Sequence, residues 1–387
     1  MSERFALERI PKKNDVKMAL LLVLIVGVGY AVLFSASYNW AEKLYGDPFR
    51  LVRRQIFWVG LGSVACFVAY RFPLDLLRRL VPALLLGGVG LMLLTFVPGL
   101  SEEYLGARRW IYVFGTSFQP SEFVRVVLVI YLAHILSRKR NQLDDTLNNV
   151  VPPLIVVLLF AGLIYIQNDF STAVFVTSVA LAIFFVAGVR LRFFVGLCIL
   201  TAPLATVLLL TREHRVLRIL AFLDPELDRF GSGYQVLAAQ RGLANGGLWG
   251  RGIGQSVQKY GALPEPHSDF VFAVLGEESG FLGIIAIVLL FAIFAFKGYQ
   301  IAMTAKDSYL SLLSFGVTSM IVFQALLNMA VVCGLVPATG IPLPFFSHGG
   351  TAVFMTLIMV GLLLNVARDG RGEERAELRR ESEVIYG

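Results

Sequence analysis

The sequence is poor in charged residues and in cysteine. Only 16% of its 387 residues are charged and 57% are hydrophobic, against about 25% and about 45–50% in typical soluble domains. This balance excludes a soluble enzyme and a disordered chain. Cys66, Cys198 and Cys333 all lie in apolar stretches, and an odd number without ligand spacing predicts neither a disulfide framework nor a metal site. The composition is typical of a polytopic helical membrane protein.

Apolar stretches long enough to cross a bilayer, about 20 residues each, occur about ten times along the chain. We therefore predict an all-α integral membrane protein with about ten transmembrane helices. The predicted spans are 18–36, 55–71, 79–97, 120–137, 151–167, 171–189, 193–211, 268–296, 308–333 and 351–367. Residues 18–367 then form a single membrane domain, preceded by an N-terminal segment over 1–17 and followed by a tail over 368–387.

Lysine and arginine flank the apolar stretches instead of gathering in one patch. The net charge of +7 is therefore a topology signal, and we predict no nucleic-acid partner. The segments on the side of both termini carry most of the basic residues once the long loop over 212–267 is set aside. Cytoplasmic segments retain such charge, whereas long loops count little. Both termini are thus predicted to be cytoplasmic, and the loop over 212–267, between the seventh and eighth spans, to be extracytoplasmic.

An arginine lies about one turn inside the fourth predicted span. Pro120 and Glu122 are typical of a helix start, but Arg125 is costly in a membrane unless it is paired or faces a wet cavity. Two interpretations are open. Arg125 pairs with Glu122 on the same helix face, or it faces an outer cavity that receives an anion. Glu277 and Glu278 in the eighth span are likewise functional groups or partners of Arg125 or of an outer-loop arginine.

Two outer segments have unusual compositions. The loop over 212–267 is long but rich in aromatic residues and leucine, which favours a functional loop over a disordered one. Its glycine-rich stretch, 250–254, follows no strand and so does not predict nucleotide binding; it predicts tight turns and close packing. The segment over 335–350 mixes prolines and glycines with apolar residues. It is predicted to be re-entrant, which is tolerated only in a protein interior or beside a wet cavity.

Basic and acidic side chains at the predicted outer surface suit an amphiphilic anion such as a lipid pyrophosphate. Asp228 is the preferred general base, because it lies in the loop between a basic stretch and a glycine hinge. It could take a proton from a sugar hydroxyl that attacks an anomeric carbon. Asp224 is the alternative, although Asp-Pro more often caps a turn. Arginines or a divalent cation, Mg²⁺ or Mn²⁺, would stabilise the leaving group.

Several motifs occur in an order that resembles the SEDS family (shape, elongation, division and sporulation), which includes FtsW and RodA. They are Arg108–Ile111, Gln119–Glu122, Phe222–Pro225 with Asp228, Gly231–Gln235, Leu263–Phe270, Gly276–Gly280 and Pro337–Gly350. The sequence departs from the family at Arg125, where Lys is usual, at 167–172, which lacks a Pro and a Gly, and at His348, where Tyr is usual. Residues 254–259 and 263–267 are more similar to FtsW and residues 340–344 to RodA, and we favour FtsW.

The resemblance implies a peptidoglycan glycosyltransferase that polymerises lipid II on the outer face of the bacterial cytoplasmic membrane, in division or elongation. It implies a class B penicillin-binding protein and other divisome or elongasome membrane proteins as partners. The family's essential aspartate falls on Asp228. The residues predicted to bind substrate are Arg108, Arg109, Trp110, Gln119, Glu122, Arg125, Arg218, Lys259, His267, Asp269 and Ser347. For His267, anchoring of the loop is the alternative. The rival functions are a transporter that flips lipid II and a non-catalytic scaffold.

Overall fold

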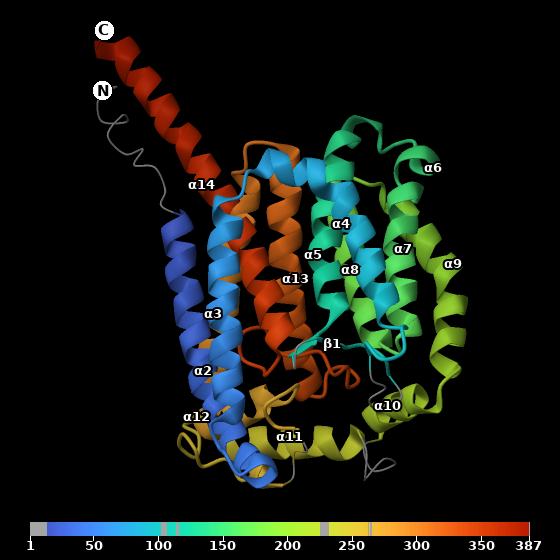
Figure 1. Cartoon of the computed structure of the whole chain (residues 1–387), viewed down its shortest axis with the longest axis vertical. Helices are drawn as coiled ribbons and strands as arrows, with labels where there is room; N and C mark the ends of the chain where they lie inside the picture. Colours follow the sequence, from blue (N-terminus) through green and yellow to red (C-terminus); the bar gives the residue numbers. More distant parts are fainter. Residues whose placement is uncertain are drawn as a thin grey trace.

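The computed structural model describes residues 14–101, 107–113, 116–224, 232–261, 263 and 265–386. Within these residues, nine helices are long and apolar enough to cross a membrane. They run side by side in one bundle (Figure 1). Helix α2 begins and helix α14 ends at the same end of this bundle, here called the terminal face (Figure 1). The opposite end, where α10 and α11 lie across the bundle, is called the loop face.

The ten predicted spans are all helical, which confirms the all-α membrane fold. The nine long helices are α2 (Asn14–Tyr45), α3 (Arg50–Arg71), α4 (Leu74–Leu94), α5 (Pro120–Arg138), α8 (Phe170–Ala187), α9 (Leu191–Leu210), α12 (Val271–Met303), α13 (Ser308–Val332) and α14 (Gly350–Tyr386). The fifth predicted span is α7 (Val151–Ile166), whose 16 residues rise about 24 Å, less than the roughly 30 Å of a bilayer core.

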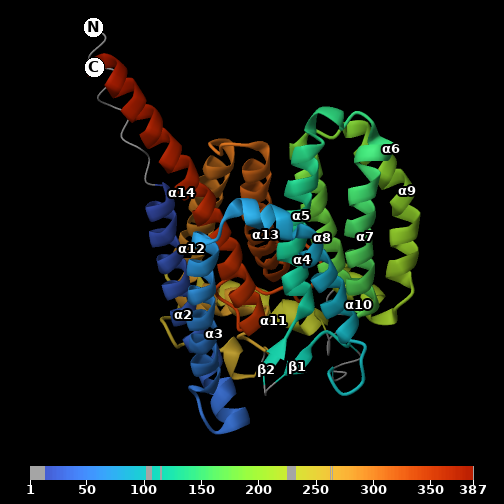
Figure 2. The same ribbon diagram turned by 45° about the horizontal axis from the view of Figure 1, so that its top comes forward.

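Shorter elements connect these helices. They are β1 (Ile111–Val113), β2 (Thr116–Phe118), η1 (Arg140–Gln142), α6 (Thr146–Asn149), α10 (Glu213–Leu223), α11 (Ser232–Gly246) and η3 (Gln258–Tyr260). The strands β1 and β2 pair antiparallel, with Ile111 opposite Phe118, and lie at the loop face (Figure 2). Hydropathy does not predict this hairpin, because each strand has only three residues.

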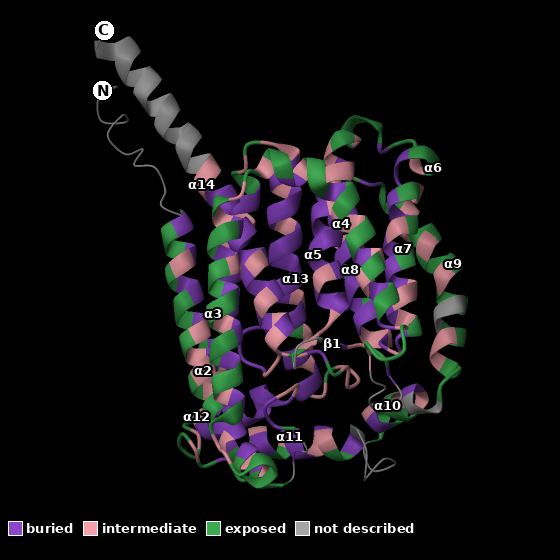
Figure 3. Ribbon diagram, in the orientation of Figure 1, coloured by how far each residue is buried: buried purple, intermediate pink, exposed green. Residues whose placement is uncertain are grey.

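The centre of the bundle is formed by α5 and α13, which are buried along most of their length (Figure 3). Helix α13 packs against α5, α8, α12 and α14, whereas α9 lies at the edge of the bundle. Cys66 is buried, as expected of a small packing residue, but Cys198 and Cys333 are exposed. Cys198 is exposed because it lies on the peripheral helix α9, and Cys333 because it follows the last residue of α13.

The segment between α13 and α14 is non-helical, as predicted for residues 335–350. Its backbone carbonyls are bound by amide side chains of α13. The Nδ2 atom of Asn328 donates to the carbonyl of Ile341 at 2.9 Å, and Nε2 of Gln324 donates to that of Pro342 at 2.9 Å. These hydrogen bonds satisfy backbone carbonyls that no helix pairs, which is why a non-helical segment is tolerated in the interior of a membrane protein. Gly29 of α2 allows close approach, because a Cβ there would lie 2.4 Å from the carbonyl oxygen of Phe345.

Helix α12 is interrupted at Gly280, whose φ of 68° is non-helical. The backbone groups freed by this break are bound by the glycine-rich loop that follows α11. The four hydrogen bonds run from Arg251 N to Glu277 O (3.0 Å), from Gly252 N to Glu278 O (3.0 Å), from Phe281 N to Gly247 O (2.9 Å) and from Leu282 N to Leu248 O (3.3 Å). The predicted role of these glycines in tight turns and close packing is thus confirmed.

We expect Gly250→Ala to destabilise the protein strongly. Gly250 has a φ of +79°, and a Cβ there would lie 2.1 Å from the carbonyl oxygen of Glu278. Overpacking of this kind costs about 1–3 kcal/mol, in addition to the cost of a left-handed alanine. Gly254→Ala is the matched control, because Gly254 has a similar φ of +85° and open space around it. Thermal unfolding in detergent should separate the two variants, and equal stabilities would contradict the packing described for the loop.

Candidate functional site

Arg125 forms a buried ion pair inside the bundle. Its side chain is 2% exposed, and its Nη1 atom lies 3.0 Å from Oε1 of Glu122 and 3.2 Å from Oε1 of Gln324. The internal pairing is therefore confirmed. The guanidinium lies 5.2 Å from the ring centroid of Phe175. Phe175 lines the cavity described below, whereas Arg125 and Glu122 do not.

The carboxylates of Glu277 and Glu278 are also paired. The Nζ atom of Lys259 donates to Oε1 of Glu278 at 2.7 Å and to Oγ of Ser35 at 3.0 Å. The Oε2 atom of Glu277 accepts from Oγ of Ser256 at 2.6 Å. These contacts fix the loop between α9 and α12 to α12 and α2. Nη1 of Arg251, in the same loop, lies 3.6 Å from Oε1 of Glu277. Of the two expected partners, a loop arginine and not Arg125 is therefore the one that pairs with a glutamate. Lys259, predicted to bind substrate, has a side chain that is 2% exposed.

A cavity of about 480 Å³ lies at the loop end of α8, beneath α10 and beside the non-helical segment. Its lining combines a charged end with a larger apolar part. The lining residues are Arg109, Asn168, Asp169, Phe170, Ser171, Val174, Phe175, Ser178, Leu209, Arg215, Arg218, Ile219, Phe323, Leu327, Val336, Pro337, Ala338, Thr339 and Gly340. Its size falls within the roughly 300–1,000 Å³ of small-molecule sites. Such a lining suits an amphiphilic anion.

Two arginines at the charged end are held by fixed partners. Arg109 donates from Nε to the carbonyl of Gln167 at 3.3 Å and from Nη2 to that of Asn168, and its Nη1 lies 3.7 Å from Oδ2 of Asp169. Arg215 is 6% exposed and donates to the hydroxyl of Tyr165 at 2.9 Å. A guanidinium group carries five N–H donors in a planar fork, so such groups also suit phosphate oxygens.

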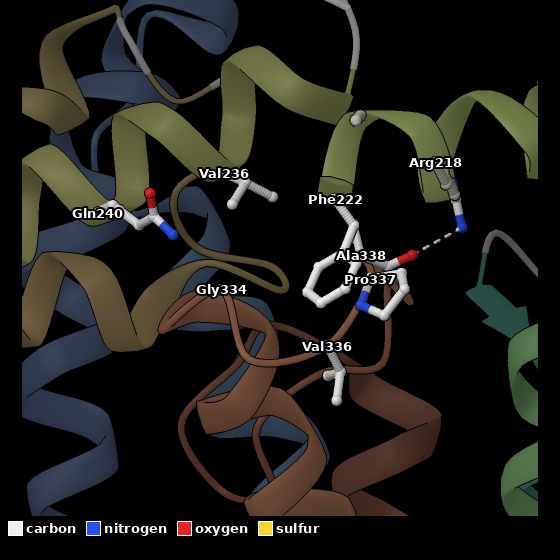
Figure 4. Close-up of a pocket in the computed structure, with 9 residues that line it drawn as sticks. Arg218, Phe222, Val236, Gln240, Gly334, Val336, Pro337 and Ala338 are labelled. Carbon is white, nitrogen blue, oxygen red and sulfur yellow. Dashed lines mark hydrogen bonds between the residues drawn. The ribbon is translucent and has the colours of Figure 1, made fainter. Parts of the chain in front are cut away.

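The third arginine, Arg218, lies on α10 and reaches the non-helical segment. Its Nη1 donates to the carbonyl of Ala338 at 3.4 Å (Figure 4). Burial lowers the pKa of Arg218, and Arg109 lowers it further, whereas Asp269 and Asp169 oppose the shift. Burial raises the pKa of Asp269 to about 6, with Glu265 adding to the increase and Arg218 opposing it. The charges of Arg109, Arg218, Asp169 and Asp269 therefore act on one another.

A second, small pocket of about 20 Å³ lies on the other side of Arg218, between α10, α11 and the non-helical segment. Figure 4 shows Arg218, Phe222, Gln240 and Pro337 among the residues around it. This volume accommodates about one water molecule. It is too small for a sugar or a phosphate and serves the packing of α10 and α11.

His267 and His348 lie together away from the cavity lining. The ring centroid of His267 is 4.4 Å from that of Trp40 and 5.8 Å from that of His348. Burial lowers the pKa of His267 to about 3, with His348 adding to the decrease, and burial lowers that of His348 to about 4. Both imidazoles are therefore neutral at physiological pH. Because the His267 carbonyl accepts from the backbone N–H of His348 at 2.8 Å, these contacts support the anchoring of the loop.

The other residues predicted to bind substrate do not line the cavity. Two of them form hydrogen bonds with neighbouring groups, and two are exposed or half-buried. Ser347 is buried and accepts from the N–H of Leu343 at 2.8 Å. Gln119 precedes α5, and its N–H donates to Oγ1 of Thr351 at 3.4 Å. Arg108 is exposed and Trp110 is half-buried. Of the residues predicted to bind substrate, Arg109 and Arg218 line the cavity, and Asp269 lies beside it.

The predicted base Asp228 lies outside the described residues. Its rival Asp224 follows the last residue of α10, and its N–H donates to the carbonyl of Leu220 at 2.7 Å. Asp224 thus occupies the C-cap position of α10. Across the described ranges, no group of three or more His, Cys, Asp or Glu could hold a metal ion. The charged side chains that line the cavity are Arg109, Arg215, Arg218 and Asp169.

Asp169 and Arg215 belong to the cavity but were not among the predicted binding residues. Asp169 caps α8 by accepting from the N–H of Thr172 at 3.2 Å. The turn before it forms without the family's Pro and Gly, because Asn168 adopts a φ of 62°, which asparagine tolerates better than most residues. The Asp-Phe-Ser-Thr stretch was a capping signal that could have placed Asp169. Arg215 had no comparable signal beyond its place in a basic stretch.

Comparisons of the sequence identify the class of protein. The family model for the FtsW, RodA and SpoVE cell cycle proteins matches residues 16–372. The chain is 35% identical to the probable peptidoglycan glycosyltransferase FtsW of Geobacter sp. (strain M18), over 92% of this chain and 98% of the relative. It is 36% identical to stage V sporulation protein E of Bacillus subtilis (strain 168), again over 92% and 98%.

Comparison with solved structures gives the same family. A chain of a complex described as a peptidoglycan synthase, in a study of the coordination of polymerization and crosslinking, matches with a TM-score of 0.75 at 28% identity, covering 92% of this chain and 97% of that one. The rod shape determining protein RodA of Thermus thermophilus matches with a TM-score of 0.66 at 27% identity, covering 91% and 96%. The chain is thus a multi-pass membrane protein, and it belongs to the FtsW/RodA/SpoVE family.

Proposed function

We propose that the chain is a peptidoglycan glycosyltransferase that polymerises lipid II into glycan strands. Membership of the family and the printed function of the FtsW relative support this activity. The structural observation that carries the proposal is the cavity with three arginines at one end of an apolar lining. The arginines suit a pyrophosphate, and the apolar part suits the polyprenyl chain attached to it.

In this mechanism the acceptor sugar hydroxyl attacks the anomeric carbon of the donor. A carbon–oxygen bond forms as the bond between that carbon and the pyrophosphate oxygen breaks, with inversion. Asp228 takes the hydroxyl proton as general base. The leaving pyrophosphate gains negative charge, which Arg109, Arg215 and Arg218 stabilise from fixed positions. The leaving group therefore needs no second acid.

A role for Mg²⁺ or Mn²⁺, as the alternative to arginine in stabilising the leaving group, stays a prediction. A divalent cation would supply further charge stabilisation to the pyrophosphate when bound. Because the described protein groups do not form a cage for it, we assign no step to the cation. Polymerisation with and without a chelator tests this point separately from the role of the arginines.

We place the chain in the bacterial cytoplasmic membrane, with the terminal face cytoplasmic and the cavity opening on the outer side. The distribution of lysine and arginine supports this orientation. A class B penicillin-binding protein is the expected partner, because a matching solved chain belongs to a complex that couples polymerization to crosslinking. Other divisome or elongasome proteins are expected around this pair. We favour FtsW over RodA, because residues 254–259 and 263–267 resemble FtsW.

The paired state of the intramembrane charges argues against the rival transporter. A flippase would use Arg125, Glu277 or Glu278 along a translocation path. Arg125 and Glu278 are instead held in ion pairs with Glu122 and Lys259. A non-catalytic scaffold would not need three arginines at an amphiphilic cavity, so the cavity favours the glycosyltransferase over the scaffold.

The test is conversion of lipid II to a glycan ladder by the purified chain with its partner, followed on a gel. We expect Arg218→Gln to raise the KM for lipid II by about 10–100-fold, because a hydrogen bond to a charged group contributes roughly 1.5–3 kcal/mol. Arg212→Gln is the matched control, since Arg212 is exposed and does not line the cavity. Transport of lipid II across vesicles without any polymer would refute the proposed function. Equal KM values for both variants would remove Arg218 from the site.

The KM for lipid II should also depend on pH through Asp269, whose pKa is raised to about 6. Below pH 6 the carboxyl is protonated, so no negative charge opposes Arg218 and the anionic substrate binds more tightly. As the pH rises through 6 the carboxylate forms, and KM should rise about 3–5-fold, corresponding to a charge interaction of roughly 1 kcal/mol. Steady-state kinetics between pH 5 and 7.5 measure this. In Asp269→Asn the rise of KM with pH should vanish. A rise that persists in this variant would show that Asp269 is not the group that titrates.

A further inference from the structure

A second large cavity, remote from the arginine cavity, opens at the terminal face. It is a groove of about 370 Å³ between α2, α3 and α14. Its lining is mostly apolar. The lining residues are Asp15, Val16, Ala19, Leu22, Val23, Ser63, Cys66, Phe67, Tyr70, Leu357 and Leu364. The spacing on α2 and on α3 places these residues on one face of each helix.

The groove has the depth of one membrane leaflet. From Asp15 to Val23 helix α2 rises about 12 Å, and from Ser63 to Tyr70 helix α3 rises about 10 Å. Half of a bilayer core is about 15 Å, whereas a spanning helix needs about 30 Å. Farther along α2, Gly29 packs against the carbonyl of Phe345, so that the space there is filled. A lipid acyl chain fits this depth, and a partner's transmembrane helix does not.

The floor of the groove is closed. A Cβ at Gly62 of α3 would lie 2.6 Å from Cδ1 of Leu357, and a Cβ at Gly361 of α14 would lie 2.4 Å from the carbonyl oxygen of Cys66. Helices α3 and α14 are therefore in close contact. An occupant can enter only between α2 and this pair of helices, from the terminal face or from the surrounding lipid.

Two guanidinium groups lie on the aromatic rings that line the groove. Arg71 lies 5.3 Å from the ring centroid of Phe67, and Arg368 lies 4.8 Å from that of Tyr70. Arg368 is also fixed by donation to Oδ1 of Asn365 at 3.0 Å. A guanidinium stacked on a ring keeps N–H groups at its edge for a phosphate. Asp15 contributes one opposing carboxylate, so that the three charges sum to a positive value.

We propose that this groove binds an anionic phospholipid of the leaflet at the terminal face. One acyl chain lies between α2 and the pair formed by α3 and α14, and the phosphodiester contacts Arg71 and Arg368. Basic pockets between membrane helices bind anionic head groups in this way. The site is separate from the arginine cavity and does not depend on the glycosyltransferase activity.

The test is native mass spectrometry of the full purified chain in detergent, titrated with phosphatidylglycerol and with phosphatidylcholine. We expect wild type to retain phosphatidylglycerol preferentially. The double variant Arg71→Gln/Arg368→Gln should lower its apparent affinity about 30-fold, from the usual contribution of two basic residues at a membrane surface. Arg79→Gln/Arg138→Gln is the matched control, because it removes two exposed arginines from the same face without touching the groove. Equal affinities in the two double variants would overturn the proposal.

A second variant tests the acyl-chain part with all the arginines in place. Ala19→Phe should fill the groove and lower phosphatidylglycerol binding by a similar factor, with an unchanged gel-filtration profile. Wild-type binding by Ala19→Phe would overturn the proposal. A photoreactive phenylalanine analogue at Val23, activated in cell membranes, identifies the occupant. A phospholipid adduct supports the inference, and a protein adduct would assign the groove to a partner helix and refute it.

Discussion

Asp228→Asn is expected to reduce glycan polymerisation by at least about 100-fold. An amide cannot accept the proton of the attacking hydroxyl, and a positioned general base contributes about 10²–10⁴-fold to a rate. The measurement is the initial rate of ladder formation from lipid II by the purified chain with its partner. Gel filtration and thermal unfolding of the same preparation should match wild type, because the change replaces one carboxylate oxygen by an NH2 group and keeps the shape of the side chain.

Asp224→Asn is the control for this experiment. Asp224 is the C-cap residue of α10 and precedes a proline, so its amide variant should keep its place after the helix and retain activity within a few-fold. Full activity in Asp228→Asn together with loss in Asp224→Asn would transfer the role of base to Asp224. Full activity in both variants would leave the mechanism without a base from this loop.

Arg125→Met should produce the largest loss of stability. Glu122 would then keep a buried carboxylate without its partner, which costs about 3–5 kcal/mol. The double variant Glu122→Gln/Arg125→Met should recover most of this loss, because it removes both charges. Unfolding in a denaturing detergent gives the free energies. The comparison of single and double variants isolates the pair from packing effects.

The reference for this experiment is an exposed pair. Arg190 lies 2.6 Å from Asp144 with both side chains largely accessible, and such pairs contribute about 0–1 kcal/mol. Arg190→Gln should therefore change the stability little. A loss of stability in Arg125→Met no larger than that in Arg190→Gln would contradict the conclusion that the buried pair of Arg125 with Glu122 stabilises the bundle.

Local patterns in the sequence were sufficient for the helices and for pairs within one helix. Hydropathy placed all ten spans because each apolar stretch carries its own signal. The spacing of three residues was enough to suggest the contact of Glu122 with Arg125. The proline-rich segment before α14 was predicted to be irregular because its composition forbids a helix. Each of these features depends on residues close together in the chain.

Contacts between segments that are distant in the sequence were harder to predict. Nothing near Glu278 specifies Lys259 as its partner, because the choice depends on how the loop between α9 and α12 folds over α12. The break at Gly280 is stable only because the loop supplies hydrogen bonds from 247–252. Likewise, Arg215 enters the cavity because α10 lies across the loop face (Figure 1). Such placements follow from packing, which one sequence does not encode in any local pattern.

The proposed function places the lipid pyrophosphate in the cavity beneath α10. The most direct measurement is photolabelling with a lipid II analogue that carries a photoreactive group near the pyrophosphate, followed by mapping of the labelled peptides. We expect label in 168–178, 215–219 and 336–340, with competition by unmodified lipid II. Saturable label confined to other parts of the chain, such as the groove between α2 and α3, would contradict it.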